Sequence, residues 1–470
     1  MKNLRDFLEN LEKDYPEEII RVSKLVDPEF ELTTVLWKLE QLGLFPAVIF
    51  ENVKNMAGQA SKIRVASNVF ATRGKVACGL DLPNEKWKME VTMEYYRRHL
   101  NLIKPKMVDK KDAPVKENVR TKDKVDLHEL PVVTHHEMDS GAYFTMPVVA
   151  KDPDTGAYNC SFQRMWVKSK NETGISIAPR HLWDYFVRYE AQKKPMPIAV
   201  VLGHHPGFVL GGMASVPIET DEYEVIGGLL NEPLRLTPSE TWGEDFLVPA
   251  DAEVVVEGEV LPGVRKVEGP FGEFTGYYGG QRLNPVVNVT AITFRNDAIL
   301  QTIFLGHPDI DHLMAVPIEG DIYTAVKPCV PTVKAVYVPS SGKCYNCYIS
   351  MKKPWEGAAR LAGMAAIPTH DFVKHVIVVD DDINIYKEEE VMFAFATRVQ
   401  GSEDIEVIKN VRGNILDPSS TRSPLWDNVI IDATKPVSRA FETRVNLPQS
   451  VIDKLELTDF ITQDVLNKLR

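Results

Sequence analysis

The clearest indication of the fold comes from residues 252–294, AEVVVEGEVLPGVRKVEGPFGEFTGYYGGQRLNPVVNVTAITF. Two runs rich in Val, Ile and Thr enclose a segment rich in Gly and Pro. Such runs are typical of β-strands joined by turns. Similar short runs occur earlier, at residues 142–150, 157–167 and 197–203. Strands at this spacing predict a β-barrel or a packed β-sandwich for the middle of the chain.

The region before this β-rich centre has the patterns of a mixed α/β unit. Apolar residues recur at helical spacing in residues 4–13 and 32–42, and residues 46–53 have the pattern of a short strand. Residues 104–126 are charged, contain proline and carry almost no large apolar side chains. This composition predicts a linker or a surface crossover.

The region after the centre has a different organisation. From about residue 317 onward, strand and helix patterns alternate, which predicts an α/β sheet. The tail after Gln449 carries Leu and Ile at helical spacing without a partner of its own, so we expect it to pack on a neighbouring subunit. The predicted fold class is therefore a mixed α/β (α+β) multidomain protein. The expected units are an N-terminal α/β domain at 1–115, a β-barrel domain at 116–316, a C-terminal α/β domain at 317–447 and a C-terminal helix at 448–470.

Length, charge and cysteine content exclude several classes of protein. A chain of 470 residues exceeds the roughly 250–300 residues at which a single core stops growing. The 54 basic and 66 acidic residues give a net charge of −12, which argues against a nucleic-acid binder. Five cysteines are too few for a disulfide framework, and the one CxxC, at Cys344 and Cys347, lacks a second half-site for zinc. Without a signal-peptide core or an apolar stretch of about 18 residues, we expect a cytoplasmic protein that does not enter a membrane.

The centre of the quoted stretch places two carboxylates on either side of a Gly-Pro-Phe-Gly turn. These are Glu268 and Glu273. Carboxylates held by a tight turn can lie in different environments, so that one stays ionised while the other holds a proton near neutral pH. The surrounding glycines allow the backbone to approach a ligand closely. A surface hairpin with solvated glutamates is the alternative interpretation.

A second candidate site precedes this turn by about one hundred residues. Arg164 lies in a predicted apolar strand, and a buried arginine needs an anionic partner, which Glu268 or Glu273 would supply. A purely structural ion pair is the alternative. Asn159 lies five residues earlier, so on a regular strand the side chains of Asn159 and Arg164 point to opposite faces.

Metal and phosphate ligand types are dispersed along the chain. Asn159, His181 and Glu222 together suit a Mn²⁺ or Mg²⁺ ion that bridges a phosphate, although a histidine at a helix start is more often structural. Lys374 precedes a strand that ends in three aspartates, which would hold a cation, cap a helix or stay solvated. The Lys374 amine would reach a phosphate.

Together these motifs resemble the UbiD-like decarboxylases, which use prenylated flavin mononucleotide (prFMN), over essentially the whole chain. The specific parts are N-x4-R at Asn159 and Arg164, and E-G-P-F-G-E-x-x-G-Y at 268–277. VIVVDDDINIY at 376–386 and DATKP at 432–436 add to the resemblance.

The resemblance implies a fold and a cofactor site. The middle domain would be a flavin-reductase-like split β-barrel, and the C-terminal α/β domain would mediate oligomerisation. Asn159, His181 and Glu222 match the family's ligands for a divalent ion, usually manganese, that anchors the cofactor phosphate. A potassium ion would use Glu222 and carbonyls of residues 213–216. The residues expected to bind prFMN are Asn159, Ser161, Phe162, Gln163, Arg164, Pro179, Arg180, His181, Met213, Ala214, Ser215, Glu222 and Lys374.

The resemblance also implies the catalytic residues and the reaction. Arg164, Glu268 and Glu273 match the family's Arg-Glu-Glu set, with Arg164 paired to Glu268 and Glu273 as the acid and base. The cofactor accepts the electrons that decarboxylation leaves, and a desolvated Glu protonates the carbon after CO₂ departs. The family's reaction is reversible, so the resemblance does not decide whether the protein carboxylates or decarboxylates its substrate.

For the substrate, the resemblance implies a small aromatic carboxylic acid. A phenolic acid of the hydroxybenzoate type is our first expectation, with His307, His312 and Lys343 as residues near the ring hydroxyls. A heteroaromatic acid of the furan or pyrrole type is the alternative. A flavin prenyltransferase would supply the cofactor, and a homo-oligomer (dimer or hexamer) is expected. Two further classes stay open, namely a non-catalytic flavin-binding subunit of a carboxylase complex and an FMN-dependent reductase.

Overall fold

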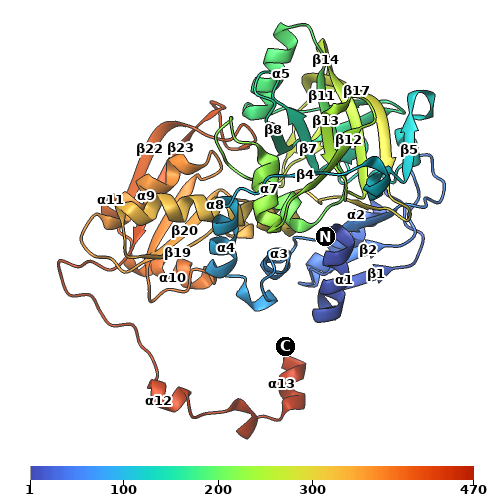
Figure 1. Ribbon diagram of the computed structural model, residues 1–470. Helices are drawn as coiled ribbons and strands as arrows, with labels where there is room; N and C mark the ends of the chain where they lie inside the picture. The colour runs from blue at the N-terminus through green and yellow to red at the C-terminus, as the bar shows by residue number, and fades with distance from the viewer. Residues whose placement is uncertain (1, 470) are drawn as a thin grey trace.

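A computed structural model describes residues 2–469 of the chain. Three regions surround the long helix α8 (Pro308–Cys329), as Figure 1 shows. The N-terminal region lies beside the central β region, and the C-terminal α/β region lies on the other side of α8. The expected mixed α/β multidomain fold is confirmed.

The central region is built on one nine-stranded sheet that curls into a half-barrel. Its longest pair is the antiparallel hairpin of β14 (Val254–Glu268) and β17 (Arg282–Phe294), which the quoted Val-, Ile- and Thr-rich runs form. The strand order is β6-β9-β10-β17-β14-β11-β7-β8, with β5 beside β17. The other strands are β5 (Asn118–Thr121), β6 (Tyr143–Phe144), β7 (Pro147–Lys151), β8 (Tyr158–Phe162), β9 (Met165–Ser169), β10 (Glu172–Gly174) and β11 (Met196–Val201).

Three helices and a small sheet lie against this half-barrel. The small sheet has the order β13-β12-β4, and its β4 strand, like β5, comes from the segment 104–126. Val115 of that segment is fully buried, so the segment is a packed surface crossover rather than a free linker. The bounds are β4 (Lys106–Met107), β12 (Arg235–Ser239), β13 (Gly243–Pro249), α5 (His181–Ala191), α6 (Pro206–Gly211) and α7 (Glu222–Leu230).

The N-terminal region contains a four-stranded sheet of order β1-β2-β3-β18. The fourth strand, β18, runs parallel to β3 and comes from residues after the barrel hairpin, so the chain returns to this sheet before it enters α8. The predicted helices 4–13 and 32–42 and the strand 46–53 are present. The bounds are β1 (Ile19–Val22), β2 (Ala47–Phe50), β3 (Arg64–Ser67), β18 (Ile299–Gln301), α1 (Leu4–Asp14), α2 (Glu31–Gln41), α3 (Arg73–Gly79) and α4 (Met89–His99).

The C-terminal region is an α/β sheet of order β19-β20-β21-β23-β22, in which β20, β21 and β23 are parallel. The boundary predicted between residues 316 and 317 falls inside α8, which continues through Pro317. The bounds are β19 (Val333–Tyr337), β20 (Asn346–Met351), β21 (His375–Asp380), β22 (Ile405–Arg412), β23 (Leu425–Ala433), α9 (Ala358–Ala366), α10 (Glu388–Arg398) and α11 (Gly401–Asp404).

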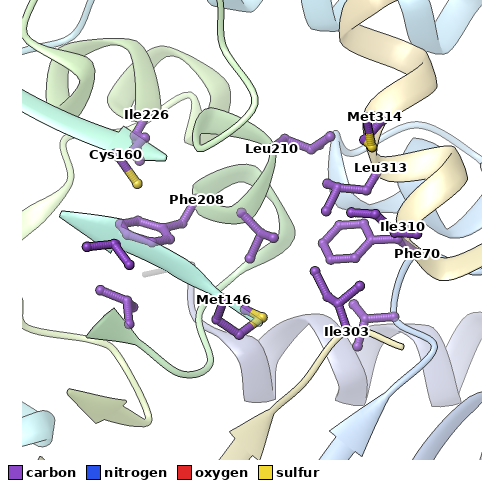
Figure 2. Packing of buried hydrophobic residues seen from close by; sticks show 14 of the residues in the cluster. Phe70, Met146, Cys160, Phe208, Leu210, Ile226, Ile303, Ile310, Leu313 and Met314 are labelled. Carbon is purple, nitrogen blue, oxygen red and sulfur yellow. The ribbon is translucent and has the colours of Figure 1, made fainter. Parts of the chain in front are cut away.

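One hydrophobic cluster connects the three regions (Figure 2). It contains Phe70 of the N-terminal region, Cys160 and Phe208 of the barrel region, and Leu313 and Met314 of α8. All are buried. The half-barrel and α8 therefore have fixed relative positions, which is required if residues from both are to form one site.

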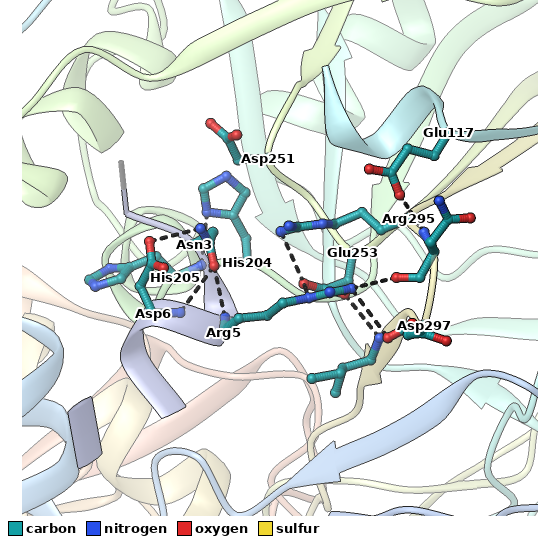
Figure 3. Close-up of polar contacts among 12 residues, drawn as sticks. Asn3, Arg5, Asp6, Glu117, His204, His205, Asp251, Glu253, Arg295 and Asp297 are labelled. Atoms are coloured by element: carbon teal, nitrogen blue, oxygen red, sulfur yellow. Dashed lines mark hydrogen bonds and ion pairs between the residues drawn. The ribbon is translucent and has the colours of Figure 1, made fainter. Parts of the chain in front are cut away.

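A buried ionic contact also ties α1 to the barrel (Figure 3). Glu253 accepts hydrogen bonds from Arg5 Nε and Nη2, both at 2.9 Å, and from the backbone N–H of Ile299 at 3.0 Å. Arg295 lies 3.3 Å from the same carboxylate. Because the Glu253 side chain is fully buried and binds two arginines, its loss would remove the anionic partner that joins α1 to the barrel region.

The chain ends in a tail that leaves the body of the molecule, as Figure 1 shows in red. Its short helices are α12 (Gln449–Ile452) and α13 (Gln463–Leu469). Val445 is 95% exposed and Phe460 is 73% exposed. Within residues 2–469, no helix has the length and apolar character needed to cross a bilayer.

Candidate active site

Arg164, Glu268 and Glu273 come together at one end of the half-barrel. Arg164 donates from Nε to Glu268 Oε1 at 3.1 Å and from Nη2 to Glu268 Oε2 at 2.8 Å. Its third nitrogen, Nη1, contacts Glu273 Oε1. Both glutamates are therefore the anionic partners of this arginine. The Arg164 and Glu273 side chains are only 8% and 10% exposed, so their ionic contacts are little screened by water.

The position of Arg164 corrects the expectation from strand spacing. Strand β8 ends at Phe162 and β9 begins at Met165, so Arg164 lies in the connection and not within a strand. The rule that odd spacing sends side chains to opposite faces does not apply across such a connection.

A tight turn carries the two glutamates. β14 ends at Glu268, and β15 (Phe271–Gly272) then pairs with β16 (Tyr278–Gly279). A Cβ atom added at Gly279 would lie 2.8 Å from Arg164 Nη1 and 3.0 Å from Glu273 Oε1. A side chain at position 279 would therefore press on the ends of Arg164 and Glu273, and glycine leaves room for their contact.

Sequence reasoning assigned no role to two residues of this site, Asn284, which lies outside the motif at 268–277, and Phe271, which lies inside it. Asn284 donates from Nδ2 to Glu268 Oε2 at 2.8 Å, because β17 returns beside β14. The guanidinium of Arg164 lies 5.5 Å from the centre of the Phe271 ring. The first contact follows from the hairpin register, which pairs Asn284 with Lys266 and is set only in the folded sheet, so the sequence carried no signal for it.

Asn159, His181 and Glu222 form the second cluster. Glu222 Oε1 accepts from Asn159 Nδ2 at 2.8 Å and lies 3.3 Å from His181 Nδ1, while Oε2 accepts from the Cys160 backbone N–H at 2.6 Å. His181 and Glu222 are the first residues of α5 and α7, and Asn159 lies on β8. Three separate elements thus bring the predicted ligands together.

The electrostatics of Glu222 reflect its burial. Burial raises the pKa of the Glu222 carboxyl above its ordinary value, and hydrogen bonds from His181, Cys160 and Asn159 act in the opposite direction. Residues 2–469 contain no group of three or more His, Cys, Asp or Glu side chains that could hold a metal ion, and the cluster at Glu222 includes an asparagine as its third predicted ligand.

The other residues expected near a cofactor divide into two groups. Ser161 donates to Asn159 Oδ1 at 2.9 Å, and Gln163 donates to Ser161 Oγ at 3.2 Å, so the end of β8 joins the Glu222 cluster. Lys374 instead donates to Asp417 at 2.8 Å and to Ser419 at 2.6 Å, within the C-terminal region. The first group contains Ser161, Phe162, Gln163, Pro179 and Arg180 beside β8 and α5, with Met213, Ala214 and Ser215 between α6 and α7.

The predicted substrate residues do not all face the same space. Lys343 donates to the Gly306 carbonyl at 3.1 Å, and Gly306 packs on the backbone of Glu273. His307 follows Gly306, stacks on Phe304 with ring centres 4.9 Å apart, and has its pKa lowered to about 3 by burial. Lys343 therefore reaches the Glu268–Glu273 turn through Gly306, and its Nζ also donates to Asp311 Oδ2 at 2.7 Å. The His307 ring lies 3.2 Å from Glu40 Oε2, and no contact joins it to Glu268 or Glu273 within the described residues.

His312 has a different environment. It lines a cavity of about 380 Å³ together with Arg73 and Tyr337, and neither Glu268 nor Glu273 lines that cavity. Burial lowers the pKa of His312 to about 3. Its role toward a substrate stays a prediction.

Comparison with known proteins identifies the family to which this chain belongs. Models of the N-terminal, Rift-related and C-terminal domains of 3-octaprenyl-4-hydroxybenzoate carboxy-lyase (UbiD) match residues 8–92, 106–308 and 311–433, respectively. The chain belongs to the UbiD family of carboxy-lyases.

Curated UbiD relatives cover nearly the full chain. Anhydromevalonate phosphate decarboxylase of Methanothermobacter thermautotrophicus is 34% identical over 93% of this chain and 98% of its own length. Phenolic acid decarboxylase of Sedimentibacter hydroxybenzoicus is 35% identical over 93% of this chain and 92% of its own length.

Solved UbiD structures agree with the fold. The UbiD-class enzyme HmfF from Pelotomaculum thermopropionicum, in complex with FMN, is 38% identical and superposes with a TM-score of 0.89 over 98% of this chain and all of that one. An evolved dimeric form of HmfF, in complex with prFMN, gives 36% identity and a TM-score of 0.86 over the same shares of the two chains.

Proposed function

We propose that this protein catalyses the reversible, non-oxidative decarboxylation of a small aromatic carboxylic acid with prFMN as its cofactor. The observation that carries the proposal is the contact of Arg164 with both Glu268 and Glu273. A buried arginine that binds two carboxylates on one turn fits a site where a carboxylate leaves and a proton is delivered. The FMN and prFMN complexes of the HmfF relatives support the cofactor.

The Glu222 cluster is the proposed anchor for the cofactor phosphate. Asn159, His181 and Glu222 supply an amide oxygen, an imidazole nitrogen and a carboxylate, which is a donor set suited to Mn²⁺ or Mg²⁺. A divalent ion would also neutralise the buried Glu222. K⁺ would bind Glu222 with carbonyls of residues 213–216. The residues at the end of β8, before α5 and between α6 and α7 would surround the flavin.

The two glutamates have different proposed roles. Glu268 accepts three hydrogen bonds, from two nitrogens of Arg164 and from Asn284, so it acts as a fixed acceptor that orients the arginine. Glu273 contacts one nitrogen of Arg164 and keeps its second oxygen for proton transfer. When bound, prFMN supplies the electron sink for breaking the bond to CO₂. Glu273 then delivers the proton that forms the new C–H bond.

A phenolic acid of the hydroxybenzoate type is the proposed substrate class. The phenolic acid decarboxylases among the relatives support it, and Lys343, which donates to Gly306 beside Glu273, suits a polar ring substituent, with His307 as the second candidate. Heteroaromatic acids of the furan or pyrrole type are the alternative. Anhydromevalonate phosphate belongs in any test, because a relative that is 34% identical is named for its decarboxylation, against 35% for the phenolic acid decarboxylase.

The deciding experiment is a substrate panel under anaerobic conditions. The protein is produced with a flavin prenyltransferase and, as a control, without one, and CO₂ release is measured for hydroxybenzoates, furan and pyrrole carboxylates and anhydromevalonate phosphate. We expect release with a phenolic acid only when prFMN is present. Full activity with FMN alone would indicate an FMN-dependent enzyme, and inactivity of the loaded protein on every acid would favour a flavin-binding subunit.

A further inference from the structure

The turn that carries Glu273 is held from outside by a short loop of the barrel region, residues 136–140, which we call the anchoring loop. Gly272 donates its backbone N–H to Asp139 Oδ1 at 2.7 Å, directly before Glu273. Ser140 donates its backbone N–H to the Pro270 carbonyl at 3.1 Å. The backbone N–H of Met138 donates to the Tyr278 hydroxyl at 3.1 Å. The loop thus contacts both strands, β15 and β16, of the turn.

Asp139 is the centre of this loop. Its side chain is fully buried, and both carboxylate oxygens are used, Oδ1 by Gly272 and Oδ2 by the backbone N–H of His136 at 2.9 Å. A carboxylate that accepts backbone N–H groups forms strong, charge-assisted hydrogen bonds. The His136 ring lies against Gly272, where an added Cβ would come within 2.3 Å of Nδ1. Gly272 therefore has little freedom to move.

We propose that Asp139 is a positioning residue, which fixes the backbone before Glu273 so that Glu273 is in place for proton transfer. This inference rests on the proposed function. Glu268 is held by Arg164 and Asn284, neither of which depends on Asp139. Loss of Asp139 therefore frees the backbone before Glu273 and leaves the Glu273 side chain held, among the described residues, only by its contact with Arg164, while Glu268 keeps all its partners. A displacement of about 1 Å at a reacting group costs about 10²-fold in rate.

The first test measures backbone protection without any cofactor. Hydrogen–deuterium exchange of peptides covering residues 268–280 is compared between wild type, Asp139→Ala and Asp139→Asn. We expect faster exchange in Asp139→Ala and an intermediate rate in Asp139→Asn, because Asn keeps one acceptor oxygen. Asp126→Ala is the control, since Asp126 also accepts a backbone N–H, from His128, but is half-buried and lies outside the anchoring loop. Unchanged exchange in Asp139→Ala would overturn the proposal.

The second test measures catalysis per bound flavin. For Asp139→Ala we expect kcat to fall about 10²-fold with KM and flavin content retained, together with slower labelling of the product from D₂O, and Asp139→Asn should restore part of both. Equal kcat and labelling in wild type and Asp139→Ala would refute the positioning role. If wild type itself releases no CO₂, the proposed function fails while the exchange test remains valid.

A variant on β16 tests the anchoring loop even if the Asp139 variants do not fold. Tyr278→Phe removes the acceptor of the Met138 N–H at an exposed position, so the fold is retained. We expect faster exchange in residues 268–280 and a smaller loss of kcat. Should the Asp139 variants not fold and Tyr278→Phe match wild type in both measurements, the anchoring loop has no positioning role.

Discussion

At the scale of single residues, the site depends on charged groups that share partners. Arg164 binds two carboxylates. Glu222 contacts an amide, an imidazole and a backbone N–H. Because each group is buried, a change of one atom alters the charge balance of the whole cluster. Substitution of Glu by Gln removes the negative charge and keeps the side-chain shape, so it distinguishes the effect of the charge from that of the shape.

Glu273→Gln tests proton transfer. Gln keeps the size and the contact with Arg164 but cannot exchange a proton, so we expect bound flavin and substrate with turnover lowered by about 10²–10⁴-fold. In D₂O the wild type should label the product at the carbon that lost CO₂, and the variant should label it far more slowly. Lys343→Ala is the comparison variant, in which we expect mainly weaker substrate binding. Wild-type turnover and labelling in Glu273→Gln would assign the proton donor to another group.

Glu222→Gln tests the proposed metal anchor. Without the negative charge, a divalent ion loses its strongest ligand, so we expect the purified protein to lack both manganese and flavin while keeping its melting temperature within a few degrees. Metal analysis and the flavin absorption spectrum measure the two contents. Stoichiometric manganese and flavin in the variant would contradict the assignment of Glu222 as a ligand.

At the scale of elements, the C-terminal tail extends away from the body of the molecule and exposes apolar side chains. Arg444 still forms an ion pair with Glu390 of α10, but the residues that follow carry exposed apolar side chains. Exposed apolar side chains of this kind mark contact surfaces. We therefore retain the expectation that α12 and α13 pack on another subunit of a homo-oligomer.

Removal of residues 446–470 tests this expectation. The cut leaves the ion pair of Arg444 in place, so we expect an unchanged fold by circular dichroism and a smaller assembly by light scattering after size exclusion. Phe460→Ser should weaken the assembly in the same direction. Leu42→Ser, which changes an equally exposed leucine of the N-terminal region, is the control and should leave the assembly intact. An unaltered assembly after truncation would exclude the tail as a subunit contact.

At the scale of the whole molecule, buried neutral histidines couple stability to pH. Burial lowers the pKa of His135, His204, His307 and His312 to about 3. Each gains a proton in the unfolded chain near pH 6.5 but not in the folded one. The stability from these groups is therefore complete above pH 6.5 and is lost as the pH falls from 6.5 toward 3.

His204→Asn measures how much His204 contributes to the pH dependence of stability. The His204 Nδ1 atom accepts from the backbone N–H of His205 at 2.8 Å, and an Asn oxygen can replace that acceptor (Figure 3). We expect the unfolding free energy between pH 6.5 and 5 to fall less steeply in the variant, by up to about 1.4 kcal/mol per pH unit. Urea unfolding at several pH values gives the slopes, with His128→Asn as an exposed control. Identical slopes in wild type and His204→Asn would contradict the burial effect.

Local patterns in the sequence determined the strands, the helices and the Glu268–Glu273 turn, because periodicity and turn residues act over a few positions. The same motifs also carried the resemblance to the family. Only the tertiary structure decided that Arg164 lies between strands and reaches both glutamates, that Lys374 binds Asp417, and that Asp139 holds the turn. These contacts join residues separated by 43 to 133 positions, and no local periodicity encodes such a distance. They follow from how the half-barrel curls and packs, which depends on the whole buried core.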